Sequence, residues 1–242
     1  NGPLATTVED AALMLSVLAA RPDLAEVAAP AGLRIAVSTR APMPATPVDR
    51  HWAAAATETA DLLRGAGHTV SAADVRYPQS LAGRELVRWM AGTELDARLL
   101  RDRDQVAVRT SRHAAVGRVA LRLGLPREKG RQTWRAQAER LFGDHDVLLT
   151  PTLAQPPVAA KAWAERGWLA NVWSNARYAP FAAPWNLAEW PAMSVPAGLD
   201  PHGLPLGVQL VARPGGESLL LGLAAQIEQL RPWPRVAPES RD

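Results

Sequence analysis

Short β-type runs alternate with segments of helical period along most of this chain, and this alternation limits the folds that the chain can adopt. Residues 33–37 and 68–75 form two such runs, and between them, in residues 48–63, apolar side chains recur every three to four positions. Strand, helix and strand in this order form a βαβ unit, whose two strands lie parallel in one sheet. The alternation therefore predicts an α/β fold.

Three further β-type runs follow, at residues 146–150, 192–196 and 206–211. Helical periodicity also predicts a first helix near residues 6–20, about three helices in 80–143 and a final helix from about residue 217. We expect a mixed β-sheet flanked by helices. No low-complexity linker divides the chain, so residues 1–234 are expected to form one domain portion, with 235–242 as a disordered tail.

Composition narrows the class of protein. The 48% of apolar residues is enough for a large core, and no apolar run approaches the ~20 residues that span a bilayer, so no membrane partner is expected. The chain has no cysteine, which excludes disulfides and thiolate sites and fits a reducing compartment, so we expect a cytoplasmic location. Its five histidines have no metal-site spacing, so neither a metal site nor a cofactor is expected.

Arginine is concentrated in residues 98–140, within a net charge of only +3. Acidic residues are interspersed there, which is typical of a solvated helical face and not of a track for phosphates. We therefore expect no nucleic-acid partner. The acidic residues are Asp102, Asp104, Glu128 and Glu139.

Four segments resemble, in the same order, segments of the amidase-signature family. They are GPLATTVEDAA (2–12), DVLLTPT (146–152), PWNLAEWPAMSVPAG (184–198) and GLPLGVQLVARP (203–214). Two positions depart from the family's pattern. Thr6 stands where the family usually has Arg, and Glu189 stands where Gly or a small residue is common, which should change a turn.

The resemblance implies hydrolysis of a C–N bond in a carboxamide or acylamide by a Ser nucleophile, a bridging Ser and a Lys base. In the family these groups precede the GPLATTVEDAA segment, so we expect them upstream of Asn1 and expect this chain, a C-terminal portion, to be inactive alone. Lys129 and Lys161, the only lysines, lie in polar surroundings and are predicted surface residues. No catalytic residue is therefore assigned in this sequence.

Two alternatives remain: the glutamine-hydrolysing subunit of a tRNA-dependent amidotransferase, and a non-catalytic fragment. For the amidase, the resemblance implies a small-molecule amide as the partner, and a homodimer is also left open.

Two groups of residues are candidates for substrate binding. Aromatic rings and an amide in a Pro-rich loop can line a pocket, although both tryptophans could instead pack in the core beneath it. The second group follows the 146–150 run, at the carboxyl end of a strand, where α/β proteins often bind ligands. The candidates are Trp185, Asn186 and Trp190 in the first group and Thr150, Pro151 and Thr152 in the second.

Overall fold

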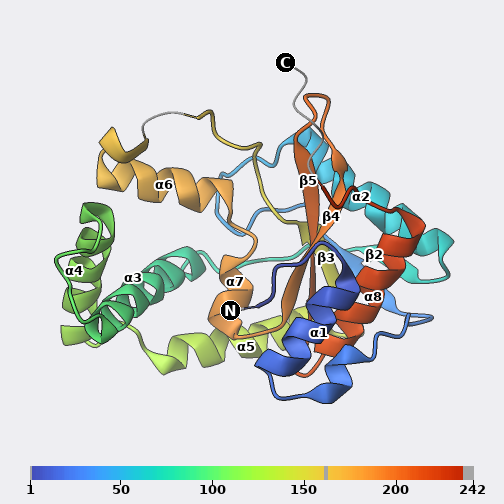
Figure 1. The fold of residues 1–242 in the computed structure, drawn as a ribbon, viewed down its shortest axis with the longest axis horizontal. Helices are drawn as coiled ribbons and strands as arrows, with labels where there is room; N and C mark the ends of the chain where they lie inside the picture. The colour runs from blue at the N-terminus through green and yellow to red at the C-terminus, as the bar shows by residue number, and fades with distance from the viewer. Residues whose placement is uncertain (1, 161–162, 237–242) are drawn as a thin grey trace.

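A five-stranded mixed sheet forms the centre of the computed structural model, which describes residues 2–160 and 163–236 (Figure 1). All five predicted strands are present and belong to this one sheet, in the order β2-β1-β3-β5-β4. The predicted α/β class is therefore confirmed. The strands are β1 (Arg34–Val37), β2 (Thr69–Ala72), β3 (Val147–Pro151), β4 (Ala192–Leu199) and β5 (Pro205–Ala212).

The strand directions divide the sheet into two parts. β1 pairs in parallel with both β2 and β3, so β1, β2 and the helix between them form the predicted βαβ unit. β5 pairs antiparallel with β3 on one side and with β4 on the other. The carboxyl ends of β1 and β3 consequently lie at the same edge of the sheet.

The described residues also form eight α-helices, and three of them lie within 80–143 as predicted. Two short 3₁₀ turns, Pro22–Ala25 and Trp163–Glu165, complete the elements. The helices are α1 (Val8–Leu18), α2 (Arg50–Gly65), α3 (Leu81–Leu99), α4 (Val108–Arg122), α5 (Glu128–Phe142), α6 (Trp168–Tyr178), α7 (Ala183–Ala188) and α8 (Glu217–Leu230).

The boundaries of α2 show how local sequence sets an element. Asp49 caps its amino end by accepting a hydrogen bond from the backbone N–H of His51 at 2.8 Å. Trp52, Ala56 and Leu63 recur at helical spacing and are buried. Gly67, with φ of +92°, then turns the chain toward β2 through a conformation that side chains disfavour.

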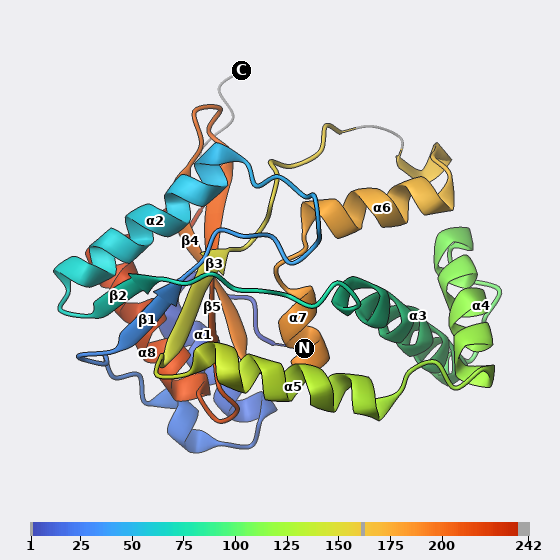
Figure 2. The same ribbon diagram turned by 180° about the vertical axis from the view of Figure 1, so that it is seen from behind.

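Alternate strand residues point to two separate cores. Ile35, Val147 and Leu149 pack on the face covered by α1, α2 and α8. Ala36 and Leu148 pack on the opposite face, with side chains of α5 and α7. This separation follows from the two-residue period of a strand, and Figure 2 shows α5 and α7 on their face of the sheet.

The helices α3, α4 and α6 lie together to one side of the sheet in both views (Figures 1 and 2). No helix within residues 2–160 and 163–236 is both long enough and apolar enough to cross a bilayer. Of the predicted tail, residues 237–242 lie outside the described part of the chain, and the division at residue 234 stays a prediction.

One local expectation was wrong. Residues 183–188 are not a Pro-rich loop but the helix α7, because Pro184 lies in its first turn, where its missing N–H is not needed. Glu189 follows α7 with φ of 57° and ψ of 40°, the left-handed conformation. That conformation is the physical reason why a glycine suits this position.

Candidate functional site

A cavity of about 370 Å³ lies where α3, α6, α7 and the loop after β1 meet. Its size falls within the range of small-molecule sites, and most of its lining is apolar. The wall comprises Pro42 and Met43 of the loop, Leu81, Ala82, Glu85, Leu86 and Trp89 of α3, Val172, Asn175 and Ala176 of α6, Tyr178 to Pro180, and Ala182, Ala183, Pro184 and Asn186 around α7.

The α3 wall is one face of a helix. Glu85 and Leu86 lie three and four residues beyond Ala82, and Trp89 lies four and three residues beyond them, which places these side chains on one face of the helix. Trp89 is 45% exposed, and its ring packs edge-on against the ring of His113 from α4, with centroids 4.7 Å apart. The packing of α4 on α3 thus supports the aromatic part of this wall.

Four polar side chains stand in this apolar lining. Asn175 and Asn186 are exposed, while Glu85 and Tyr178 are half-buried. Burial raises the pKa of the Tyr178 phenol, so it stays neutral and keeps a proton to donate. A few polar groups converging in an apolar cavity are typical of a site that orients a ligand.

The carboxyl group of Glu85 has an unusual environment. Desolvation raises its pKa from the ordinary value of 4.5 to about 7, against the opposing charge of Arg88. Arg88 itself pairs with Glu128 at 3.2 Å. Within the described residues, Glu85 has no hydrogen-bond or ion-pair partner, so its carboxyl group is available to a ligand.

Backbone and side-chain hydrogen bonds tie the cavity to the carboxyl edge of the sheet. The N–H of Ala154, just beyond β3, donates to the carbonyl of Tyr178 at 3.0 Å, and the N–H of Asp49 donates to the carbonyl of Ala154 at 2.7 Å. The side chain of Gln209 donates to the carbonyl of Phe181 at 3.1 Å. The cavity therefore lies at the sheet edge where open α/β sheets usually bind ligands.

The predicted binding residues are divided between the cavity and the core. Asn186 lines the cavity, whereas Trp185 and Trp190 are 1% and 6% exposed and pack with Phe142 and Trp134, as in the alternative that placed them in the core. These two tryptophans pack behind the cavity wall, in the core between α7 and the sheet.

The three residues at the end of β3 do not line the cavity either. Thr150 and Pro151 are buried, and Thr150 accepts a hydrogen bond from Gln209 at 3.3 Å. Thr152 is half-buried, with its hydroxyl 3.0 Å from that of Ser194. They lie at the carboxyl end of β3, the sheet edge to which hydrogen bonds attach the cavity wall.

The sequence-based selection of candidates missed Glu85 and Gln209. Both carried a detectable signal. Glu85 stands between Leu81 and Trp89 at helical spacing, which places a carboxylate on an otherwise apolar helix face. Gln209 stands between Val208 and Leu210 in a β-type run that is otherwise apolar, where a buried amide requires partners.

The arginine-rich segment is only in part the solvated face that the sequence indicated. Glu94 of α3 is 1% exposed and accepts hydrogen bonds from Arg98 at 3.0 Å, Arg103 at 3.0 Å and Arg118 at 3.3 Å. These bonds, that of Arg118 above all, lower the pKa of Glu94 to about 2. This cluster joins α3, α4 and the turn between them, so three arginines have a structural role.

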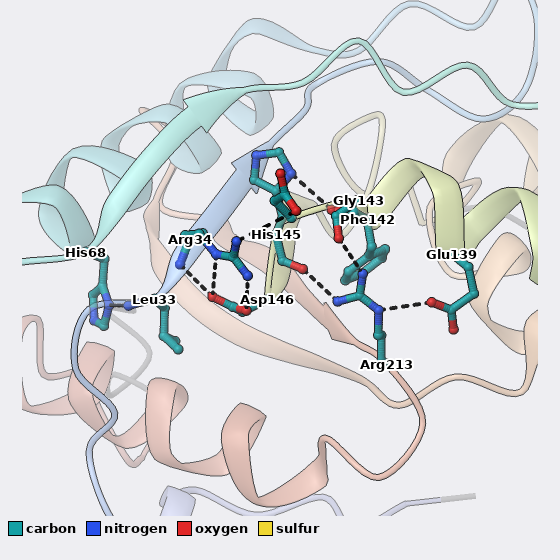
Figure 3. Close-up of polar contacts among 10 residues, drawn as sticks. Leu33, Arg34, His68, Glu139, Phe142, Gly143, His145, Asp146 and Arg213 are labelled. Carbon is teal, nitrogen blue, oxygen red and sulfur yellow. Dashed lines mark hydrogen bonds and ion pairs between the residues drawn. The ribbon is translucent and has the colours of Figure 1, made fainter.

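A second polar network lies at the opposite, amino edge of the parallel strands (Figure 3). Asp146 accepts hydrogen bonds from the backbone N–H of Arg34 at 2.8 Å and from its guanidinium at 3.2 Å. Arg213 donates to the carbonyls of Gly143 and His145, both at 2.8 Å, and to Glu139 at 3.0 Å. These charged side chains pair with one another and with backbone groups, which indicates that the network fixes the turn into β3 and is not a ligand site.

Comparisons with known proteins relate this chain to amidases. AmiB2 of Mycobacterium tuberculosis, whose name places it among the amidases, is 36% identical over 247 residues, which cover 98% of this chain and 53% of that protein. The 6-aminohexanoate cyclic dimer hydrolase, solved with its substrate, superposes with a TM-score of 0.68 at 25% identity over 94% of this chain and 54% of its own. A bacterial aryl acylamidase of the amidase-signature family superposes with a TM-score of 0.66 at 18% identity, over 96% and 53% of the two chains.

The chain therefore spans about half the length of the curated relatives that it matches. The family model for amidases matches residues 1–221, which include all five strands and every residue that lines the cavity. The chain belongs to the amidase family.

Proposed function

We propose that the protein containing this chain hydrolyses the C–N bond of a small carboxamide or acylamide. The observation that carries the proposal is the cavity at the carboxyl edge of the sheet, in a chain that matches the amidase family over residues 1–221. The cavity is mainly apolar and holds few polar groups, which suits the acyl or amine substituent of an amide.

The chemistry that we propose is the one implied by the resemblance: a Ser nucleophile, a bridging Ser and a neutral Lys that accepts the relayed proton, with backbone amides holding the oxyanion. In this proposal these groups come from polypeptide outside the present sequence. Lys129 lies exposed on α5, which does not suit a neutral catalytic amine, and Lys161 lies outside the described residues. In this proposal, residues 1–242 contribute the cavity that holds the substrate.

The cavity favours an amide with an apolar substituent over glutamine. Glutamine carries an α-carboxylate beside its α-ammonium group, and this carboxylate requires a cationic or strongly donating partner, yet the charged residue of the described cavity lining is Glu85. We therefore rank the amidase above the glutamine-hydrolysing subunit. An activity assay distinguishes the amidase from the non-catalytic alternative.

The decisive assay compares the full gene product with residues 1–242 on a panel of aryl and alkyl amides and on glutamine. We expect the full protein to release amine or ammonia from the amides, its Lys129→Ala variant to retain that turnover, and residues 1–242 alone to be inactive. Turnover by residues 1–242 that survives Lys129→Ala and Lys161→Ala would place the chemistry in this chain. A full protein that releases ammonia from glutamine alone would favour the amidotransferase subunit, and one without any turnover the non-catalytic alternative.

Four expectations accompany the proposal: a small-molecule amide as the partner, no nucleic-acid binding, a homodimer as a candidate assembly and a cytoplasmic location. Size-exclusion chromatography with light scattering tests the assembly.

A further inference from the structure

The cavity contains one carboxyl group that the fold leaves without a partner. Glu85 is the charged residue in the lining contributed by the described chain, and it stands among Leu81, Leu86 and Trp89. Carboxyl groups in apolar surroundings are usually paired, because an unpaired one loses its hydration without compensation. A ligand that supplies the missing partner would gain from this arrangement.

The surroundings of Glu85 favour a cation over other ligands. An ammonium group can donate to the carboxylate and lie against the ring of Trp89, a residue that is 45% exposed. The phenol of Tyr178 and the amides of Asn175 and Asn186 add further acceptors on the other walls. A ligand carboxylate, in contrast, would be repelled by Glu85 and would meet no cationic side chain in the described lining.

Arg88, whose positive charge acts on Glu85, is paired with another carboxylate. It lies on the same helix and its guanidinium is 3.2 Å from Glu128 of α5. Its charge lowers the pKa of Glu85, but desolvation outweighs it. The carboxyl group therefore keeps its free position at the cavity wall.

We propose that Glu85 is a specificity-determining residue that selects substrates whose apolar substituent ends in an ammonium group. This inference rests on the proposed function, which it deepens by naming the substrate class: amides with an ω-amino alkyl chain. The cavity takes the alkyl chain between α3 and α6, and the carboxylate of Glu85 takes the terminal ammonium.

The first experiment measures binding without hydrolysis, on the full protein and with ligands that contain no amide bond. Calorimetric titration compares n-pentylamine, which is cationic at pH 8, with n-pentanol, which has similar length and no charge. A charge-assisted contact should make the amine bind about tenfold more tightly than the alcohol. Glu85→Gln should remove this preference, whereas Glu9→Gln, which deletes an equally negative exposed residue on α1, should retain it.

The pH provides a second measurement on the unmodified chain. The alkylammonium stays charged from about pH 5 to about pH 8, since amines of this type have a pKa near 10.4. The preference for amine should fall on acidification, because protonated Glu85 no longer attracts the cation. A preference that is unchanged by pH and by Glu85→Gln, or the absence of binding by either ligand, would overturn the inference.

The second experiment uses the full protein and the amides 5-aminopentanamide and pentanamide. We expect kcat/KM to favour the amino compound about tenfold, and Glu85→Gln to remove this ratio. Amine binding that depends on Glu85, without hydrolysis of either amide, would refute the proposed function and leave the binding inference standing. Hydrolysis of both amides at equal kcat/KM would refute the selectivity and leave the amidase proposal standing.

Discussion

The side-chain amide of Gln209 donates a hydrogen bond of 3.1 Å to the backbone carbonyl of Phe181. Gln209 lies within β5 and is 4% exposed, and Phe181 lies between Pro180 and Ala182, two residues of the cavity wall. The same amide also donates to Thr150 at 3.3 Å. One buried side chain thus fixes the distance between the sheet and the cavity wall.

Gln209→Leu should destabilise the protein by about 1–3 kcal/mol, because it leaves the buried carbonyl of Phe181 without a donor. Urea unfolding measures this loss, and hydrogen exchange at residues 179–182 should accelerate. Thr150→Val is the control, since it keeps the bond to Phe181 and removes the longer contact with Gln209, together with the bond from the Thr150 hydroxyl to the carbonyl of Pro151. An equal loss in both variants would show that the bond to Phe181 has no special weight.

Gly117 in α4 and Gly92 in α3 should respond in opposite ways to the same substitution. A Cβ at Gly117 would lie 1.9 Å from the backbone oxygen of Met90, so Gly117→Ala must push α4 away from α3, at a cost of about 2–4 kcal/mol. A Cβ at Gly92 would meet no atom within 4 Å. Gly92→Ala should therefore stabilise the protein by about 0.5–1 kcal/mol through helix propensity.

Thermal unfolding of the two variants is the measurement for this pair. A shift in the same direction for both would mean that the close approach of α3 and α4 does not govern the response at Gly117.

Glu189 combines a disfavoured backbone conformation with two ion pairs, to Arg131 and Arg135 of α5. Glu189→Ala keeps the disfavoured conformation and loses the pairs, so it should cost about 1–2 kcal/mol. Glu189→Gly loses the pairs but relieves the backbone, so it should stay within about 1 kcal/mol of the wild type. Denaturant midpoints that rank alanine above glycine would contradict this explanation.

Protonation of Glu85 should make stability depend on pH. Its pKa is raised from 4.5 to about 7 in the folded protein, so between these values the folded state holds more protons than the unfolded state. Stability should therefore fall as the pH rises through this window, by on the order of 1–2 kcal/mol after allowance for the group's partial exposure. Glu85→Gln should remove this part of the slope in urea titrations at about pH 5 and pH 8, and an unchanged slope would assign it to other groups.

Strands could be predicted from the sequence because each has a short-range signal. Residues 146–150 are a continuous β-type run stopped by proline, and the period of residues 48–63 ends at two glycines. Helix α7 was missed because Pro184 lies in its first turn and Pro191 follows it closely, and prolines that close together are more typical of loops.

The cavity could not be predicted in the same way. Its walls come from residues 42–43, 81–89 and 172–186, and their meeting depends on how α3 and α6 pack, which no local spacing encodes. Residues of the α7 segment were named as candidates from the sequence, and helix geometry divides their side chains: Asn186 faces outward and lines the cavity, while Trp185 is buried on the sheet side. A one-residue step on a helix turns a side chain by about 100°, so the helix had to be known first.

The sheet order β2-β1-β3-β5-β4 has a consequence for synthesis on the ribosome. When the nascent chain has emerged as far as β3, the edge of that strand has no partner until β5 follows, and Gln209 is 59 residues beyond its partner Thr150. The backbone N–H of Val8 waits longer still, for a carboxylate of Glu228 that is 220 residues away. A ribosome that stalls in this interval presents a strand with apolar side chains and an unpaired backbone edge. Chaperones bind such surfaces, which otherwise aggregate.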